Sequence, residues 1–329
     1  MNSVDTKPSR TRSSVFDRPS SPLLACPLCR TSLSANHADS LLCPSCHFTV
    51  RFVDGIWRAL PAERTIHYEK FIRDYETIRQ AEGRGSEDTN YYLSLPYRDS
   101  TGRLDWQWQI RGTTYRCLEH EFWPKLEELY PECCDVLDIG AGNGWLSYRV
   151  ALRGHRPVAV DVVLNELDGL GAAKHYWVSL KQSFPCFQAE MDHLPFADRQ
   201  FDVAVFNASL HYSTNYVVTL NEALRCLRPR GHLLIMDSPL YHAAESGRQM
   251  VQERHLLFEK QYGFRSDSIA SLEFLTFDQV RSLGTQLRLS WKNLRPHYGV
   301  AWSLRPLRAW FKGGREPSKF HVLWGQRTI

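Results

Sequence analysis

Residues 136–144 read Val-Leu-Asp-Ile-Gly-Ala-Gly-Asn-Gly, an apolar run that contains one acid and continues into three alternate glycines. The apolar run predicts a buried strand, and the glycines allow the backbone to turn tightly and to approach a ligand closely. A turn of this kind between a strand and a helix is typical of loops that bind nucleotide-like cofactors. A glycine-rich turn without a ligand is the alternative.

The spacing of the glycines distinguishes a dinucleotide-binding loop from loops that bind other nucleotide-like cofactors. A dinucleotide loop of the G-x-G-x-x-G type that starts at Gly140 requires glycine at position 145, where this chain has Trp145. The pattern that remains, D-x-G-x-G-x-G, resembles motif I of the class I S-adenosylmethionine-dependent methyltransferases. The resemblance implies cofactor contacts for the acid and the loop, namely Asp138, Gly140, Ala141, Gly142 and Gly144.

A second predicted strand ends in an acid as well. Residues 157–161 read Pro-Val-Ala-Val-Asp, and Asp161 lies 21 residues after Gly140. This spacing is that of the acid that binds ribose hydroxyls in strand-helix-strand units. By the same resemblance, Asp161 is expected to bind both ribose hydroxyls of the cofactor.

A third segment, residues 187–206 (FQAEMDHLPFADRQFDVAVF), resembles the type 11 or UbiE-like methyltransferases. Aligning Leu-Pro-Phe at 194–196 places Glu190 at the adenine-binding acid of that family and Met191 beside the adenine face. Asp192 is close enough to compete for the role, and Asn207 follows the next strand as a further cofactor residue. An ordinary turn that packs an aromatic ring is the alternative for 194–196.

The alternation of elements predicts the fold class. Buried strands are expected at Asp135–Ile139, Val158–Val160, Phe201–Phe206 and Leu233–Met236, with amphipathic helices at 216–227 and 277–283. Such alternation implies an α/β, doubly wound, Rossmann-like sheet with the ligand at the carboxyl ends of its strands. We expect seven mostly parallel strands, of which the last two, near 287–293 and 319–326, form the antiparallel hairpin of the methyltransferase fold.

Two Cys-Pro-x-Cys knuckles stand near the amino end. Each presents two thiols from a tight turn, and thirteen residues separate the pairs, which are Cys26 with Cys29 and Cys43 with Cys46. Four thiolates in this arrangement are the ligand set that structural Zn²⁺ prefers; disulfides and a redox pair are the alternatives. We expect a zinc ribbon over residues 21–60, whose metal can be removed without loss of cofactor binding.

The order of parts adds a narrower resemblance. A zinc ribbon followed by motif I is also the order in the bacterial 23S rRNA guanine-N1 methyltransferase. Residues 1–20 are rich in Ser, Arg and Pro and are expected to form a disordered leader without a secretory signal. No apolar run is long enough to cross a bilayer, so we expect a cytoplasmic protein of unknown oligomeric state.

Residues 61–130 lie between the ribbon and the methyltransferase core, which we expect to span 131–329. Two helices are predicted there, one with Phe71, Tyr75 and Ile78 on a shared face and one over 114–130. In related enzymes such a segment covers the cofactor and shapes the substrate pocket. Tyr92 and Arg98 are therefore candidate contacts, and a solvated helical pair without contacts is the alternative.

Charge is unevenly distributed although the net charge is only +4. Residues 285–329 hold nine Lys or Arg against the single acid Glu316, with four tryptophans interleaved. Basic residues beside aromatic rings suit phosphate contacts and base stacking, so RNA bound by the ribbon and this basic zone is one expected partner. The alternative is a hairpin with inward tryptophans and solvated arginines.

The loop after the fourth strand, 207–213, faces the methyl group in this fold. His211 and Tyr212 are its titratable pair and are our catalytic candidates, since either can orient or deprotonate an acceptor; His211 as a helix cap is the alternative. The sequence thus predicts in-line methyl transfer from S-adenosylmethionine, with Zn²⁺ as a structural ion. RNA and a small molecule remain as acceptors, and a non-catalytic cofactor-binding regulator remains as the other class.

Overall fold

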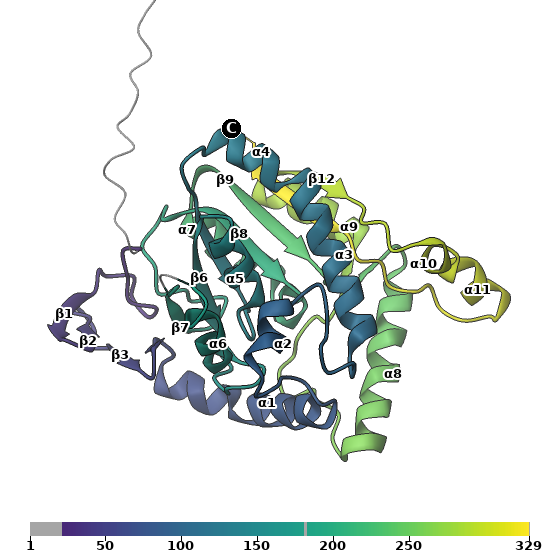
Figure 1. Ribbon diagram of the computed structural model, residues 1–329, viewed down its shortest axis with the longest axis horizontal. Helices are drawn as coiled ribbons and strands as arrows, with labels where there is room; N and C mark the ends of the chain where they lie inside the picture. The colour runs from purple at the N-terminus through teal and green to yellow at the C-terminus, as the bar shows by residue number, and fades with distance from the viewer. Residues whose placement is uncertain (1–21, 181–182, 329) are drawn as a thin grey trace, which may run out of the picture.

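The computed structural model describes residues 22–180 and 183–328, so the expected leader lies outside the described residues. One eleven-stranded sheet runs through the molecule in the order β1-β2-β3-β4-β7-β6-β5-β8-β9-β13-β12 (Figure 1). Residues 131–328 contribute β5 to β9, β12 and β13 to this sheet, and the two-residue strands β10 and β11 form a separate pair. The sheet is larger than predicted because the strands of the amino-terminal segment extend it.

The central strands are parallel and correspond to the predicted apolar runs. Their neighbours are β7-β6-β5-β8-β9, with β5 in the middle. The chain therefore reverses direction of winding at β5, which creates a switch point at the carboxyl ends of β5, β6 and β8. Their bounds are β5 (Asp135–Ile139), β6 (Arg156–Asp161), β7 (Cys186–Gln188), β8 (Phe201–Asn207) and β9 (Leu227–Met236).

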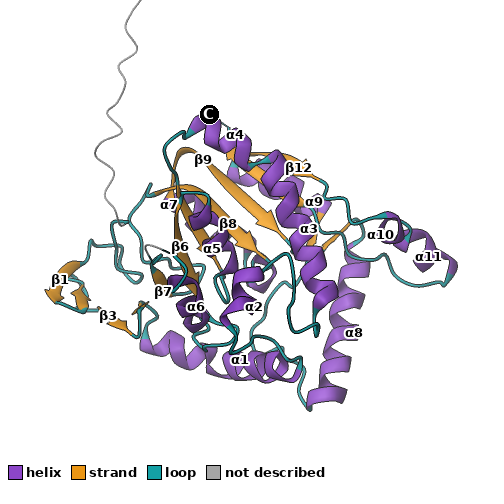
Figure 2. Cartoon of the chain, viewed as in Figure 1, coloured by secondary structure: helices purple, strands orange, loops and turns teal. Residues whose placement is uncertain are grey.

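Both faces of this sheet are buried. Successive side chains of a strand point to opposite faces, so Val203 and Val205 of β8 join one apolar cluster while Ala204 and Phe206 join the other. The first cluster is covered by α2 (Thr89–Ser94), α3 (Asp105–Glu121), α4 (Trp123–Leu129), α5 (Trp145–Leu152) and α6 (Lys174–Trp177). The second is covered by α7 (Tyr216–Cys226) and α9 (Phe277–Leu287) (Figure 2).

Local capping signals define both helices of the second layer. The side chain of Asn215 accepts hydrogen bonds from two backbone N–H groups at the start of α7. Thr276 and Gln279 form the predicted capping box at the start of α9. The capping box is confirmed, and α9 continues to Leu287, four residues beyond the predicted end.

The carboxyl end folds back as two antiparallel strands. β12 (Leu289–Leu294) pairs antiparallel with β13 (Val322–Arg327), and β13 also pairs antiparallel with β9. Two short helices, α10 (Val300–Ser303) and α11 (Arg305–Phe311), lie between them and project from the body of the molecule (Figure 1). A longer helix that the sequence patterns did not predict, α8 (Ala244–Tyr262), follows β10 (Leu240–Tyr241), which pairs with β11 (Leu275–Thr276).

The cysteine-bearing segment is continuous with the core sheet. Its strands are antiparallel to one another, but the last of them pairs in parallel with β7, so that Trp57 lies opposite Phe187. The ring centroids of these two residues are 6.5 Å apart, and the ring planes are nearly parallel. The segment comprises β1 (Ser34–His37), β2 (Ser40–Leu42), β3 (Thr49–Val53) and β4 (Ile56–Arg58).

The chain leaves β4 directly into α1 (Ala62–Ala81), which contributes side chains to the cavity at the carboxyl ends of the parallel strands. Within the described ranges, no helix combines the length and the apolar character needed to span a bilayer. The position of α1 follows from the sheet: because β4 is paired beside β7, the next residues must emerge at the same edge as the glycine loop.

Candidate active site

The glycine loop adopts a backbone that other residues rarely tolerate. Gly140, Gly142 and Gly144 have φ angles of +73°, +55° and +80°. A Cβ atom on Gly140 would lie 2.3 Å from Cβ of Ser209, so the close approach of the loop after β8 also requires glycine. The N–H groups of Gly140 and Ala141 both donate to the carbonyl of Val160 at 2.8 and 3.0 Å, which fixes the loop to β6.

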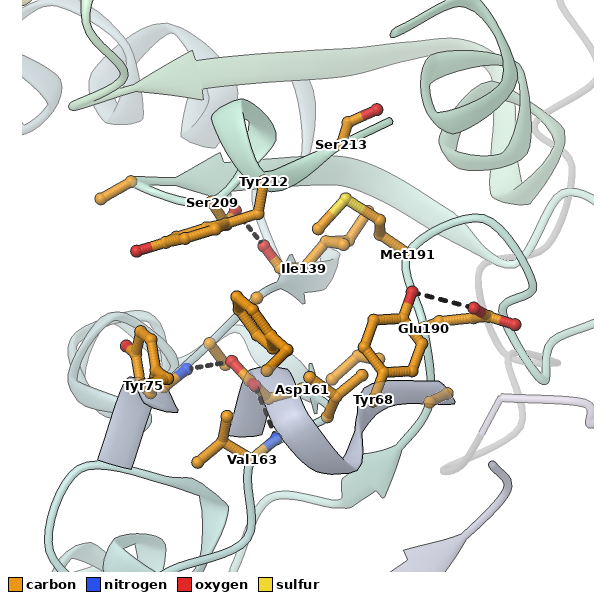
Figure 3. Close-up of a pocket in the computed structure, with 18 of the residues that line it drawn as sticks. Tyr68, Tyr75, Ile139, Asp161, Val163, Glu190, Met191, Ser209, Tyr212 and Ser213 are labelled. Carbon is orange, nitrogen blue, oxygen red and sulfur yellow. Dashed lines mark hydrogen bonds between the residues drawn. The ribbon is translucent and has the colours of Figure 1, made fainter. Parts of the chain in front are cut away.

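Asp161 lies at the end of β6, as predicted, and faces the cavity beside this loop (Figure 3). One carboxylate oxygen accepts the N–H of Gly142 at 2.8 Å and the other accepts the N–H of Val163 at 2.9 Å. Burial raises the pKa of Asp161 from its usual value. Because a carboxylate can accept about four hydrogen bonds, Asp161 retains capacity for two further donors, such as a pair of ribose hydroxyls.

Glu190 lies after β7 and is held by two residues of α1. Arg64 donates to both of its carboxylate oxygens, with the shortest contact at 2.7 Å, and the hydroxyl of Tyr68 donates at 3.0 Å. The carboxylate is only 4% exposed, so this pairing compensates its burial. Figure 3 shows Tyr68 pointing from α1 toward Glu190.

The neighbours of Glu190 also reach the cavity. Met191 and Asp192 line it, and Asp192 accepts a short hydrogen bond from the hydroxyl of Thr219. Asn207, at the end of β8, lines the cavity as well, and its buried Oδ1 has no hydrogen-bond partner among the described residues. An unpartnered amide oxygen beside a cavity is suited to a ligand that donates a hydrogen bond.

Two members of motif I do not line the cavity. Asp138 is 1% exposed and accepts a hydrogen bond from the hydroxyl of Ser147 at 2.9 Å, behind the loop. Burial raises the pKa of Asp138 to about 7. Gly144 is the N-cap residue of α5, and an added Cβ would lie 3.4 Å from the ring of Phe184. Both residues shape the loop from behind.

One face of α1 closes the cavity over the loop. Residues spaced by three or four positions lie on one helical face, and six residues of α1 with such spacings line the cavity: Arg64, His67, Tyr68, Phe71, Tyr75 and Arg79. The enclosed volume is about 330 Å³, within the usual range of small-molecule sites. The shared face of Phe71 and Tyr75 was predicted from the sequence, and by resemblance their segment was expected to cover the cofactor; the sequence named Tyr92 and Arg98 as candidate contacts rather than these residues of α1.

Cationic side chains gather at the loop end of the cavity. Arg79 lies 3.5 Å from Asp168 and 4.4 Å from the ring centroid of Tyr75. Arg111 of α3 also lines the cavity; burial, with the nearby charges of Arg84 and Arg79, lowers its pKa. The charges of Asp168 and the arginines were not anticipated from the sequence, because they come from segments far apart in the chain.

The two catalytic candidates are in contact but differ in their access to the cavity. Tyr212 lines the cavity, and its ring lies edge-on to those of Phe71 and Tyr75, with centroids 5.8 and 6.2 Å away. His211 does not line the cavity. Its Nδ1 lies 3.3 Å from the hydroxyl of Ser238, and its ring packs against that of Tyr212.

Burial and the positive charges of Arg254, Arg79 and Arg111 lower the pKa of His211 to about 3. The imidazole is therefore neutral near pH 7 and is a weak proton acceptor. Neither of the two insert candidates lines the cavity: Tyr92 donates from its hydroxyl to the carbonyl of Leu167 at 2.8 Å, and Arg98 is exposed.

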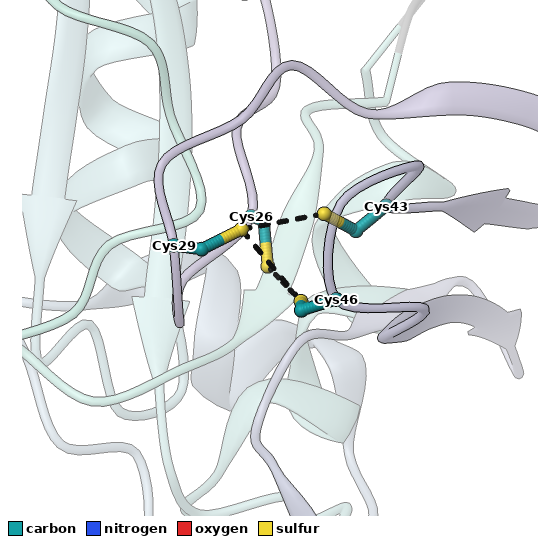
Figure 4. Close-up of side chains that lie close together, drawn as sticks. All are labelled: Cys26, Cys29, Cys43 and Cys46. Atoms are coloured by element: carbon teal, nitrogen blue, oxygen red, sulfur yellow. Dashed lines mark hydrogen bonds between the residues drawn. The ribbon is translucent and has the colours of Figure 1, made fainter.

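The four amino-terminal cysteines converge on one point (Figure 4). Their sulfur atoms all lie within 4.8 Å of one another, and the shortest separations are 3.4 Å, between Cys26 and Cys46 and between Cys29 and Cys43. A tetrahedral Zn²⁺ with four thiolates at about 2.3 Å requires separations of roughly 3.8 Å. The thiols are free rather than disulfide-bonded, so the geometry fits a zinc site.

Most tryptophans of the basic zone near the carboxyl end do not present their rings to solvent. Of its four tryptophans, only Trp310 is exposed; Trp324 donates to Nδ1 of His232 at 2.9 Å, and Trp302 lies under the guanidinium of Arg305. The inward packing is the alternative that the sequence left open. In Figure 1 the cysteine ribbon and the α10–α11 segment lie at opposite ends of the molecule.

Comparison with known proteins agrees with this geometry. Residues 137–235 match the family model described as a methyltransferase domain. Uncharacterized methyltransferase YodH of Bacillus subtilis is 31% identical over 105 residues, which cover 32% of this chain and 43% of YodH. The ubiquinone/menaquinone biosynthesis C-methyltransferase UbiE of Blochmanniella pennsylvanica is 31% identical over 124 residues, covering 36% and 48% of the two chains.

Among solved structures, the 1,6-didemethyltoxoflavin-N1-methyltransferase of Burkholderia thailandensis, determined with S-adenosylhomocysteine, aligns with 90% of this chain and 99% of its own. The identity is 16% and the TM-score 0.46. The chain spans less than half the length of the two curated relatives described above.

The strand order and the glycine loop are consistent with the match of residues 137–235 to a methyltransferase domain, and this part of the chain resembles the class I methyltransferases, which use S-adenosylmethionine. UbiE is one of the relatives that this part of the chain is similar to.

Proposed function

We propose that this protein is an S-adenosylmethionine-dependent methyltransferase whose acceptor is a small organic molecule. The observation that carries the proposal is the cavity of about 330 Å³ between the face of α1 and the glycine loop, with Asp161 and Glu190 along it. A cavity closed by a helix suits a compact acceptor. UbiE, one of the relatives, is named for a step in quinone biosynthesis, which is a small-molecule pathway.

The residues that line the cavity fit the cofactor in three places. Asp161 has spare acceptor capacity for ribose hydroxyls, and Glu190 with Met191 forms the end assigned to adenine. Arg79 and Asp168 carry the charges complementary to an α-carboxylate and an α-ammonium group. When bound, S-adenosylmethionine supplies a methyl group on a positively charged sulfur.

The protein's own part in the reaction is to orient the acceptor and to exclude water. Tyr212 faces the cavity, and its hydroxyl makes no hydrogen bond within the described part of the chain, so it is available to the acceptor. His211 packs behind that ring and is neutral near pH 7. We therefore assign Tyr212 the acceptor contact and His211 a positioning role.

An RNA acceptor receives less support. The ribbon and the α10–α11 segment of the basic zone lie at opposite ends of the molecule (Figure 1). Three of the four tryptophans expected to stack on bases are partly buried. Single-stranded RNA binding commonly depends on exposed aromatic rings beside the positive charges.

The proposal is tested in two stages. Calorimetry should show S-adenosylmethionine binding to the parent protein and to Asp39→Ala, an exposed ribbon acid, but at least a hundredfold weaker binding to Asp161→Ala. Methyl-labelled cofactor is then supplied with total RNA, protein and small-metabolite fractions. Label is expected in the small-metabolite fraction; label in RNA would establish the RNA acceptor, and label in no fraction would favour a cofactor-binding regulator.

A further inference from the structure

The segment between β12 and β13 leaves an apolar helical face in solvent. Backbone hydrogen bonds from Leu304 to Val300 and from Arg308 to Leu304 continue across the junction, so α10 and α11 form one bent helical arm over residues 299–315. Pro306 lies in the first turn of α11, where proline is tolerated. In Figure 1 this arm stands away from the sheet beside α8.

The exposed apolar side chains of the arm fall on one side. A helix of 3.6 residues per turn brings positions i, i+4, i+7 and i+11 together. Val300, Trp310 and Phe311 are 71%, 72% and 73% exposed, values far above those of a packed core. The complete exposed face consists of Val300, Leu304, Leu307, Trp310 and Phe311.

Unpaired positive charge lies beside this face. The arm contains four basic residues and no acid. Arg305 is turned inward onto Trp302 and the carbonyl of Ser318, and Arg315 pairs with Glu253 at 2.7 Å. Arg308 and Lys312 are exposed and form no ion pair with any described residue.

The base of the arm is anchored to the methyltransferase domain. The hydroxyl of Tyr298 donates to the carbonyl of Phe320 at 2.9 Å and lies 2.8 Å from the hydroxyl of Thr114 on α3. The apolar face is therefore presented by a fixed support. No residue of the arm lines the cavity.

We infer that this arm docks the protein on the surface of an anionic lipid bilayer. Trp, Phe and Leu on one face with Arg and Lys beside it are the features of helices that lie in the membrane interface. The apolar face can enter the acyl boundary while Arg308 and Lys312 meet negatively charged headgroups. The inference does not depend on the methyl acceptor.

Two other occupants fit the arm less well. A second copy packed face to face would bring Arg308 and Lys312 near their equivalents, with no acid on the arm to compensate. Single-stranded RNA can stack on Trp310 and Phe311, but it leaves Val300, Leu304 and Leu307 without an apolar partner. A bilayer provides for the aromatic, aliphatic and cationic groups together.

The test is co-sedimentation with sucrose-loaded vesicles. One set consists of phosphatidylcholine alone, and the other contains about 30% phosphatidylglycerol, which gives the vesicles a negative surface potential. The parent protein should bind the anionic vesicles. A Trp310→Ser/Phe311→Ser double variant should lose at least tenfold in partitioning. Arg308→Ala/Lys312→Ala should lose about 25-fold on anionic vesicles, from about fivefold per base, and little on neutral ones.

Trp106→Ser is the matched control, because Trp106 is an exposed tryptophan (62%) on α3, outside the arm. It should bind vesicles as the parent does, and all variants should retain the circular dichroism spectrum and S-adenosylmethionine affinity of the parent. The inference is overturned if the parent ignores anionic vesicles, or if the aromatic double variant binds them equally well. Two further results would overturn it. One is a parent that forms a dimer which the aromatic double variant loses. The other is a parent that binds oligonucleotides but not vesicles, with the oligonucleotide binding lost in the variant.

Discussion

Arg30, in the first cysteine knuckle, makes two hydrogen bonds to the carboxylate of Glu222 on α7, at 2.6 and 2.8 Å. The same carboxylate accepts the backbone N–H of Leu194 at 2.8 Å, and Arg30 also donates to the carbonyl of Leu194. Nearby, the N–H of Ala25 donates to the carbonyl of Pro195 at 3.1 Å. The first cysteine knuckle is thus connected by hydrogen bonds to the segment that begins with Glu190.

Removal of the metal should therefore weaken cofactor binding. If chelation releases the first knuckle, the segment from Glu190 to Leu194 loses its contacts with Arg30 and Ala25. We expect the affinity for S-adenosylmethionine to fall about tenfold, measured by calorimetry, and to recover when Zn²⁺ is added back. Unchanged affinity would contradict this prediction and support the expectation from the sequence that the ribbon is independent of cofactor binding.

Loss of the Arg30 side chain should destabilise the protein. In Arg30→Ala, Glu222 (6% exposed) keeps its contact with Arg225 but loses two charged hydrogen bonds. We expect the free energy of unfolding in urea to fall by about 1–2 kcal/mol. Arg51→Ala, an exposed arginine of β3, is the control and should change it by less than about 0.5 kcal/mol. Equal effects would show that the Arg30 contact contributes nothing specific.

Gly140→Ala should prevent formation of the cofactor loop. The new methyl group would overlap Cβ of Ser209, and the φ of +73° is unfavourable for alanine. We expect a loss of more than 2 kcal/mol in stability and no detectable S-adenosylmethionine binding. Adding Ser209→Gly should recover only the part of the loss that comes from overlap; full recovery would mean that φ is not restrictive.

Asp138→Asn should change the pH dependence of stability. The folded pKa of about 7 lies above the usual 3.8, so the folded protein binds a proton that the unfolded chain releases between about pH 4 and 7. The parent therefore loses stability as pH rises through that window, while the variant does not. Between pH 5 and 8 the variant should gain about 2–3 kcal/mol relative to the parent in urea titrations. A constant difference across this range would contradict the raised pKa.

Tyr212→Phe tests the acceptor contact once a substrate is identified. The variant keeps the ring packing against Phe71 and Tyr75 but removes the hydroxyl. We expect kcat to fall at least tenfold with unchanged affinity for S-adenosylmethionine. His211→Gln should alter kcat less, and the parent's pH–rate profile should show no ionisation of His211 near pH 6–7 because its pKa is about 3. Parental kcat in Tyr212→Phe would remove the hydroxyl from the mechanism.

Local sequence signals were sufficient to predict the positions of elements whose interactions form between neighbouring residues. The strand-to-glycine transition at Ile139, the acid at Asp161, the capping box at Thr276 and the four clustered cysteines all lie where spacing and residue type predicted. In each, the deciding interactions form within a few residues or along one strand. Hydrophobic periodicity and backbone preference carry that information without knowledge of the rest of the chain.

The tertiary structure alone decided what those elements face. Sequence spacing did not reveal that β4 pairs with β7, that Arg64 reaches Glu190, or that His211 turns away from the cavity while Tyr212 faces it. These contacts join segments more than a hundred residues apart or depend on which side of a loop is buried. The glycine loop and its acids could therefore be predicted from the sequence. The side chains of α1 that face the cavity, the charges at the loop end of the cavity and the contacts between the first cysteine knuckle and the Glu190 segment depend on long-range packing.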